Sequence, residues 1–314
     1  MTQARFVHIV DDVPELEGLS DGPVMLTALD GFLDAGNASA LAASHLLENS
    51  SSRVVASFEI DEFFDYRARR PPMTFLEDHY ADYDAPRLVV RLLHDDSNAP
   101  YLLLTGPEPD MRWEAFAEAV RKVIEHFEVR LTVSLGSVPM AVPHTRPVQL
   151  TNHATSKRLL ISSNVWGGEI RIPSSAQSLL ELRLGEWGHD ATGFVAHIPH
   201  YVAQFGYPEA SAAMLHQVGV VTGLSWDTTD LDEAAADRRT EIAGQVDDSD
   251  DVRAVVEGLE QQYDAFHTGA PNLLDPTDDA LGDALRNGGE LPTGDELGEQ
   301  FEQFLAGLEQ TEED

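Results

Sequence analysis

Through the first two-thirds of the chain, short apolar runs alternate with segments in which apolar residues recur at helical spacing. Residues 24–29 form an apolar run between Gly22-Pro23 and Asp30-Gly31, and residues 53–60 are rich in β-branched and aromatic side chains. Both runs have the length and composition of strands, and residues 37–48 between them are expected to be a helix. Strands that alternate with helices predict an α/β fold with a largely parallel sheet covered on both faces.

The same alternation continues towards residue 200. Residues 87–94 and 101–105 predict a hairpin, because the turn-forming residues 95–100 separate them. Apolar side chains recur at helical spacing from Trp113 to Phe127. Residues 129–135 and 192–198 are expected to be further strands of the same sheet.

The charge of the chain restricts its partners. Fifty-five acidic against 20 basic residues give a formal net charge of −35. Such a surface repels phosphate backbones and anionic lipid, so we expect neither nucleic acid nor membrane as a partner. The absence of cysteine excludes disulfides and zinc–thiolate sites. With no secretory signal at Met1 and no apolar run of membrane-spanning length, the cytoplasm is the expected compartment.

The acid residues concentrate at the end of the chain. Residues 227–314 contain 26 acidic residues and 4 arginines. We therefore expect an α/β domain over residues 1–226 and an acidic helical appendage over residues 227–314. An apolar stripe from Val252 to Phe266 and a capping box at Thr293 and Glu296 predict its helices. Residues 309–314 are expected to form a disordered tail.

Two polar clusters are candidate ligand sites. Asp30 and Asp34 follow the first long strand and precede a helix, which indicates either a ligand site at the strand end or a tight turn with a helix cap. Arg67 and Arg69, with Arg70 beside them, could clamp a carboxylate or phosphate. The alternative, which we favour, is an ion-pair network with the acids nearest in sequence, which are Asp61, Glu62 and Asp65.

Catalytic and metal motifs are weak by comparison. His197 and His200 end a predicted strand, but Pro199 between them favours a strand-to-loop exit with hydrogen-bonded histidines over metal ligation. Gly136-Ser137 lacks the Gly-x-Ser-x-Gly pattern of a nucleophile elbow. We therefore predict no metal, no cofactor and no catalytic set.

Several of these segments, taken in order, resemble the proteasome assembly chaperone 2 family in its actinobacterial branch. The resemblance spans about residues 20–225 and rests on residues 31–36, 65–71, 104–109, 143–147 and 196–201. It implies a three-layer α/β/α fold like that of phosphorylases and peptidyl hydrolases, with a mixed sheet. It also implies a homo-oligomer, with a trimer as the expected form. Chaperones of the family escort proteasome α-subunits and dock through a C-terminal hydrophobic-Tyr-any tripeptide.

The sequence departs from that pattern where it ends in Glu312-Glu313-Asp314, which counts against a literal proteasome-docking role. Our hypothesis is therefore a non-catalytic assembly or interaction protein that associates with itself and with an unidentified protein partner. The alternative is a small-ligand binder or a hydrolase- or phosphorylase-like enzyme. That activity would use a cleft near Asp30, Asp34, Arg67, Arg69 and His197.

Overall fold

The computed structural model describes residues 2–161, 169–247 and 249–268. The chain divides into two compact units, Met1–Tyr263 and Asp264–Asp314, and the fold below is that of the first. Its strands are β1 Thr2–Ala4, β2 Val7–Ile9, β3 Val24–Asp30, β4 Arg53–Phe58, β5 Met73–Leu76, β6 His79–Tyr83, β7 Val89–His94, β8 Pro100–Pro107, β9 Leu131–Met140, β10 Leu150–Ala154 and β11 Ala191–Pro199. The helices are α1 Ala38–Glu48, α2 Trp113–His126, α3 Ala176–Glu186, α4 Pro208–Thr222, α5 Thr229–Asp247 and α6 Asp250–Thr268, which continues into the second unit.

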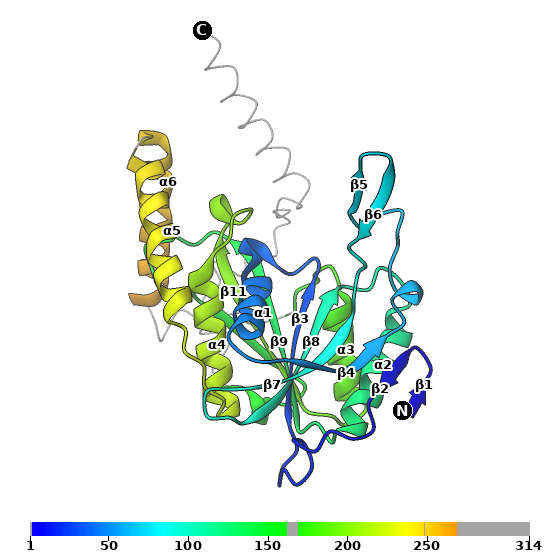
Figure 1. Ribbon diagram of the computed structural model, residues 1–314. Helices are drawn as coiled ribbons and strands as arrows, with labels where there is room; N and C mark the ends of the chain where they lie inside the picture. Colours follow the sequence, from blue (N-terminus) through cyan, green and yellow to red (C-terminus); the bar gives the residue numbers. More distant parts are fainter. Residues whose placement is uncertain (1, 162–168, 248, 269–314) are drawn as a thin grey trace. The chain divides into compact units, whose positions relative to one another are not determined.

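One mixed sheet organises the first unit (Figure 1). Its strand order is β1-β2-β4-β7-β8-β3-β9-β11-β10. The four strands β8, β3, β9 and β11 are parallel, and the strands on either side of them pair antiparallel. The α/β fold with a mixed sheet is therefore confirmed, and the parallel pairing lies at its centre. The predicted hairpin is also present, because β7 pairs antiparallel with β8 from Val89 opposite Thr105 to His94 opposite Pro100.

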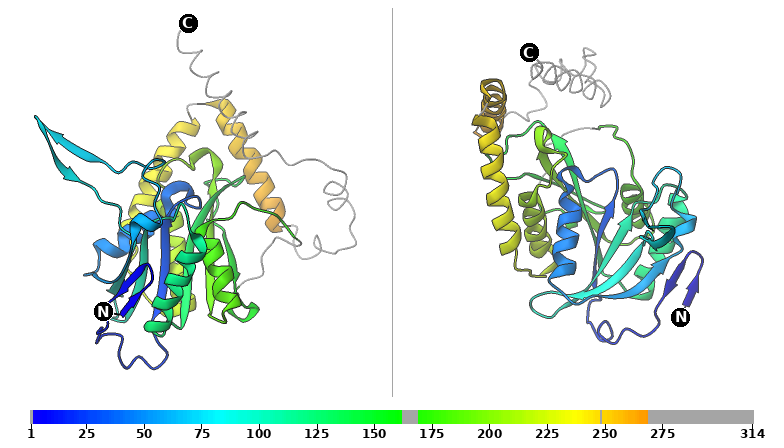
Figure 2. Two further views of the ribbon diagram at one scale, coloured as in Figure 1. Left: turned by 90° about the vertical axis from the view of Figure 1, so that its right-hand side faces the viewer. Right: turned by 45° about the horizontal axis from the view of Figure 1, so that its top comes forward.

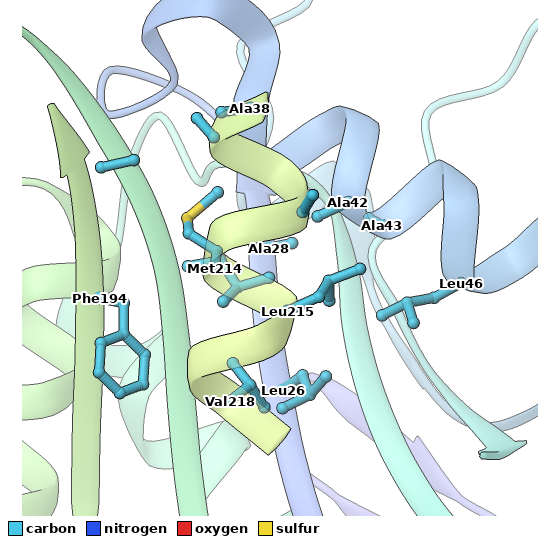
Figure 3. Close-up of a cluster of buried hydrophobic side chains, with 14 of the residues drawn as sticks. Leu26, Ala28, Ala38, Ala42, Ala43, Leu46, Phe194, Met214, Leu215 and Val218 are labelled. Atoms are coloured by element: carbon cyan, nitrogen blue, oxygen red, sulfur yellow. The ribbon is translucent and has the colours of Figure 1, made fainter. Parts of the chain in front are cut away.

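The core lies in two layers, one on each face of the sheet. Along β3, Leu26 and Ala28 face α1, α4 and α5, whereas Met25 and Leu29 face α2 and α3. This alternation follows from the two-residue period of a strand. Figure 3 shows the first layer, in which Met214 and other side chains of α4 pack over the sheet. Buried apolar residues on both faces explain why the central strands read as continuous apolar runs.

The predicted strands differ from the structure in their bounds and in their number. β9, expected to end at Leu135, continues to Met140, so Gly136 and Ser137 lie within a strand. A small second sheet, β5–β6, has no counterpart among the sequence predictions and projects beyond the main sheet (Figure 2). Its strands are solvent-exposed throughout, so no packing against the core imposes the alternation of apolar and polar residues by which strands are recognised in a sequence.

The acidic region contributes helices to the first unit. α5 packs on α4 and buries Leu231, Ala235 and Ile242. The following helix, α6, buries Val256 and Leu259, two members of the predicted stripe. The change in composition at residue 227 thus lies inside the first compact unit. The capping box at Thr293 and the predicted tail lie outside the described residues, and no described helix is both long and apolar enough to cross a bilayer.

Candidate functional site

Two of the five predicted site residues, Asp30 and Asp34, lie at the carboxyl end of β3 and in the loop that follows it. Asp30 is the last residue of β3 and pairs with Pro107 at the end of β8. The backbone N–H of Glu108 donates to the Asp30 carbonyl at 2.9 Å. In a parallel sheet this edge is where ligands most often bind. The structure therefore places Asp30 at the edge that the sequence predicted.

Asp34 serves as a helix cap. Its carboxylate accepts hydrogen bonds from the backbone N–H of Ser39 at 2.6 Å and of Ala40 at 3.2 Å, in the first turn of α1. The hydroxyl of Ser137 donates to the Asp34 carboxylate at 3.3 Å and to the Ala35 carbonyl at 2.7 Å. A carboxylate at this position satisfies amides that have no partner within the helix. These contacts match the turn-and-cap alternative of the sequence analysis.

The neighbouring charges of Asp34 and Arg69 both act on the protonation of Asp30. Partial burial raises the pKa of Asp30, the negative charge of Asp34 raises it further, and Arg69 opposes both effects. Burial also raises the pKa of Asp34, against the hydrogen bonds that Ser39, Ala40 and Ser137 donate to its ionised form. Asp30, Asp34 and Arg69 thus form one electrostatic group at the sheet edge.

Arg69 is held by partners distant in sequence. Its guanidinium forms an ion pair with the Asp110 carboxylate at 2.7 Å and donates to the Glu108 carbonyl. The guanidinium also lies 4.7 Å from the centre of the Phe64 ring. The predicted pairing of Arg69 with a carboxylate is therefore present, but with Asp110 instead of the acids nearest in sequence. Those acids have other partners: Asp61 accepts from Tyr66, Glu62 pairs with Arg112, and Asp65 accepts from the backbone of Arg67.

Arg67 and His197 stand apart from this group. The side chain of Arg67 is exposed at the surface of the loop. His197 is buried on β11, where its Nε2 hydrogen-bonds to the Thr151 hydroxyl of β10 at 2.8 Å. Burial lowers the pKa of His197. Of the five predicted residues, Asp30, Asp34 and Arg69 therefore belong to the electrostatic group at the sheet edge, and Arg67 and His197 do not.

A groove of about 540 Å³ lies beside the electrostatic group, and Asp30 and Arg69 are part of its lining. Three arginines line it, two from the loop before β5 and one from the segment before β7, together with Asp30, prolines and aromatic rings. The lining residues are Asp30, Phe64, Arg69, Arg70, Pro71, Pro72, Tyr83, Asp84, Ala85, Pro86, Arg87, Gly106 and Pro107. Among the described residues, His, Asp and Glu side chains form no cluster of three or more that could hold a metal ion.

Glu108 is a residue whose role the sequence analysis missed. One carboxylate oxygen accepts from the backbone N–H of Phe32 at 3.1 Å, and the other accepts from Ala176 at 2.6 Å at the start of α3. Glu108 thus joins the loop after β3 to the first residue of α3. Its place directly after a central strand, between Pro107 and Pro109, was the signal that could have identified it.

Arg69→Ala is expected to lower the free energy of unfolding by about 1–2 kcal/mol, because the half-buried Asp110 carboxylate and the Glu108 carbonyl lose a donor. Arg67→Ala, in the same loop but exposed, is the matched control and should change stability by less than about 0.5 kcal/mol. Urea denaturation of both variants measures the difference. Equal losses for the two variants would contradict the structural role of Arg69.

His197→Gln is expected to alter the pH dependence of stability. Because burial lowers the pKa of His197, the wild type has a contribution to stability that is present above the unfolded pKa of 6.5 and lost as the pH falls through the folded pKa. A glutamine amide can replace the hydrogen bond to Thr151 without titrating. The wild type should therefore lose stability relative to the variant below pH 6.5, by at most about 1.4 kcal/mol per pH unit.

Denaturation curves between pH 7.5 and 5 test this expectation. His200→Gln provides the control, since His200 lies three residues further on and is exposed. Its curve should run parallel to that of the wild type. Parallel curves for His197→Gln as well would show that His197 does not contribute in this way.

Comparison with known proteins places this architecture in a family. The model of the PAC2 family matches residues 28–246. The chain belongs to the PAC2 family. The resemblance inferred from the sequence is thereby confirmed, and the match extends from β3 through most of α5.

Three solved structures illustrate the range of similar PAC2-type folds. Rv2714, a Mycobacterium tuberculosis protein of unknown function, is 45% identical with a TM-score of 0.80, over 85% of this chain and 94% of its own. A Corynebacterium glutamicum protein of unknown function is 35% identical with a TM-score of 0.79, over 83% and 98%. Rv2125, a Mycobacterium tuberculosis proteasome-assembly chaperone homologue, is 25% identical with a TM-score of 0.69, over 74% and 99%. No curated protein matches the chain.

Proposed function

We propose that this PAC2 protein is a non-catalytic assembly or interaction protein that acts in the cytoplasm. The observation that carries the proposal is membership of the PAC2 family, together with similarity to a proteasome-assembly chaperone homologue. The contacts of two candidate site residues, Asp34 and Arg69, support the proposal. Asp34 caps α1 and Arg69 pairs with Asp110, so both side chains have structural partners.

Self-association is part of the proposal, with a trimer as the expected form. The test is light scattering at micromolar concentration and physiological salt, where an oligomer is expected. Salt matters because a net charge of −35 makes subunits repel each other at low ionic strength. A monomer under these conditions would contradict the self-association.

A protein partner is the second part, and proteasome α-subunits are the first to test. Native mass spectrometry of the purified chain mixed with actinobacterial α-subunits should show a complex of fixed stoichiometry if the chain escorts them. Separate species would limit the proposal to self-assembly and to other partners.

The arginine-lined groove favours a second candidate function, the binding of a small anion. Arg70 and Arg87 line the groove and are exposed, so they could contact a carboxylate or phosphate. Thermal shift with phosphates, nucleosides and carboxylates tests this function. Stabilisation by one anion that Arg70→Ala abolishes, with the melting temperature of the free protein unchanged, would favour the ligand-binding function over the assembly function.

A further inference from the structure

The groove beside Asp30 is lined by charged side chains that have no partner within the described residues. Arg70 and Arg87 form no ion pair there, although the chain has 55 acidic residues and only 20 basic ones. The Asp30 carboxylate accepts no hydrogen bond there either. Two arginines left unpaired on one groove of so acidic a chain indicate that the groove binds an anion.

Three separate segments bring these side chains to one edge of the sheet. Asp30 ends β3, and β3 and β7 lie on either side of β8. Because β7 runs antiparallel to β8, Arg87, which precedes β7, lies at the carboxyl end of β8, as Asp30 does. Gly106 of β8 approaches the Arg87 carbonyl so closely that a Cβ would not fit between them. Strand pairing therefore positions Asp30 and Arg87, and Arg70 joins them from the loop before β5.

The arrangement of the arginines favours a phosphate over a carboxylate. A carboxylate has two oxygens in one plane, and a single guanidinium can pair with both of them. A phosphate monoester has three terminal oxygens in a tetrahedral arrangement and carries a charge of about −1.5 to −2 at pH 7. It can therefore accept hydrogen bonds from two guanidinium groups that approach from different segments. Arg70 and Arg87 are two such groups, whereas Arg69 is already paired with Asp110.

The acids of the groove disfavour a bare phosphate ion. Asp30 and Asp84 both line it, and an ionised carboxylate repels phosphate and can only accept hydrogen bonds. The negative charge of Asp34 acts on Asp30 as well. A ligand that presents a hydroxyl group to Asp30 offsets this repulsion with a hydrogen bond to a charged acceptor. The groove therefore fits a phosphate ester whose organic part carries hydroxyl groups.

The size of the groove agrees with an organic phosphate. Its volume of about 540 Å³ lies within the range of about 300–1,000 Å³ that is typical of small-molecule sites. Pro71, Pro86 and Pro107 supply apolar walls beside the charges. The net charge of −35 acts mainly at low ionic strength, because the Debye length is only about 8 Å at physiological salt. At physiological salt the side chains of the groove therefore decide whether a small anion binds.

We propose that the groove binds a phosphate monoester that carries hydroxyl groups, such as a sugar phosphate or a nucleoside monophosphate. Arg70 and Arg87 bind its phosphate, and the Asp30 carboxylate accepts a hydrogen bond from a hydroxyl group. The inference rests on the second candidate function, the binding of a small anion, and names the class of ligand. It adds one requirement to that function, which is a hydroxyl donor at Asp30.

Isothermal titration calorimetry with two matched phosphate esters tests the requirement for hydroxyl groups. Ribose 5-phosphate is the probe, and cyclopentylmethyl phosphate, which has a five-membered ring but no hydroxyl group, is its counterpart. We expect ribose 5-phosphate to bind about fivefold more tightly at physiological salt, because only this ester can donate to Asp30. Adenosine 5′-monophosphate distinguishes the two sources of the ligand. Tighter binding than that of ribose 5-phosphate identifies a nucleotide, and equal or weaker binding identifies a sugar phosphate.

Substitutions in the full chain separate the roles of the charged side chains. Asp30→Ala should weaken the binding of ribose 5-phosphate and strengthen that of cyclopentylmethyl phosphate, because it removes an acceptor for the first ester and a repulsion for the second. Arg70→Ala and Arg87→Ala should each weaken the binding of both esters about tenfold, since each removes a charge-assisted contact. Arg67→Ala, which is exposed in the same loop as Arg70 but does not line the groove, is the control and should change neither affinity. Circular dichroism establishes that each variant is folded.

The outcomes separate the proposal from the anion-binding function on which it rests. If neither ester binds at millimolar concentration, both are overturned. If the two esters bind equally and Asp30→Ala strengthens both, the groove binds anions but the requirement for a hydroxyl group is wrong. Gluconate, a hydroxylated carboxylate, would overturn the choice of phosphate by binding as tightly as ribose 5-phosphate. Binding of ribose 5-phosphate that survives both Arg70→Ala and Arg87→Ala would show that the groove is not the site.

Discussion

Phe194→Ala is expected to lower the free energy of unfolding by about 3–5 kcal/mol. Phe194 lies on β11 with its side chain fully buried, 0% exposed, in the layer beneath α1 and α4 (Figure 3). β11 pairs with β9 on one side and β10 on the other, at Leu135 and Asn152. Because both neighbours fix the backbone, the sheet cannot close over the missing ring, and a cavity remains.

Such a loss is a large part of the total stability of a folded domain, about 5–15 kcal/mol. Phe32→Ala is the matched control, since Phe32 is 63% exposed and loses little contact on truncation. Urea denaturation should give a change below about 0.5 kcal/mol for that variant. Losses of similar size for the two phenylalanines would mean that the layer on this face is not packed as described.

The central strands were predictable because burial on both faces leaves a continuous apolar run. Residues 24–29 and 192–198 are such runs, and they correspond to β3 and β11. The helix α2 was equally clear, since Phe116, Val120 and Ile124 recur at the spacing that places them on one face. In each case the pattern within a single segment determined the element.

The contacts of the candidate site could not be predicted in this way, because they join segments far apart in the chain. The sequence offered Asp61, Glu62 and Asp65 as partners for the arginines. The fold instead brings Asp110, which follows β8, to Arg69. Proximity in sequence is a poor guide for a residue in a loop, where the geometry is set by neighbouring strands.

The β5–β6 hairpin escaped prediction for a different physical reason. Strands are recognised in a sequence by the alternation of apolar and polar residues, which arises because one face of the strand packs against the core. Every residue of β5 and β6 is exposed, so neither strand packs against the core and no such alternation is imposed on its sequence.

Gly106→Ala is expected to cost about 2–6 kcal/mol, because two unfavourable effects combine there. Gly106 lies on β8 with φ of +131°, a conformation that residues with a Cβ rarely adopt. A Cβ at this position would lie 2.1 Å from the Arg87 carbonyl oxygen and 2.8 Å from the Leu88 Cα. These are backbone atoms of the adjacent segment, which cannot move aside as a flexible side chain could, so overpacking adds to the strain.

Gly188→Ala separates the two effects. Gly188 also has a positive φ, +82°, but a Cβ there would meet no atom within 4 Å, so its substitution should cost only about 1–2 kcal/mol of backbone strain. The excess at Gly106, measured by urea denaturation, is then the cost of crowding against Arg87. Because Gly106 and Arg87 both line the groove, the same substitution should displace Arg87 and disturb the edge where Asp30 and Arg69 meet. Equal losses of unfolding free energy for the two alanine variants would show that β8 approaches residue 87 less closely than described. Arg87 would then not depend on a glycine at residue 106 for its place in the groove.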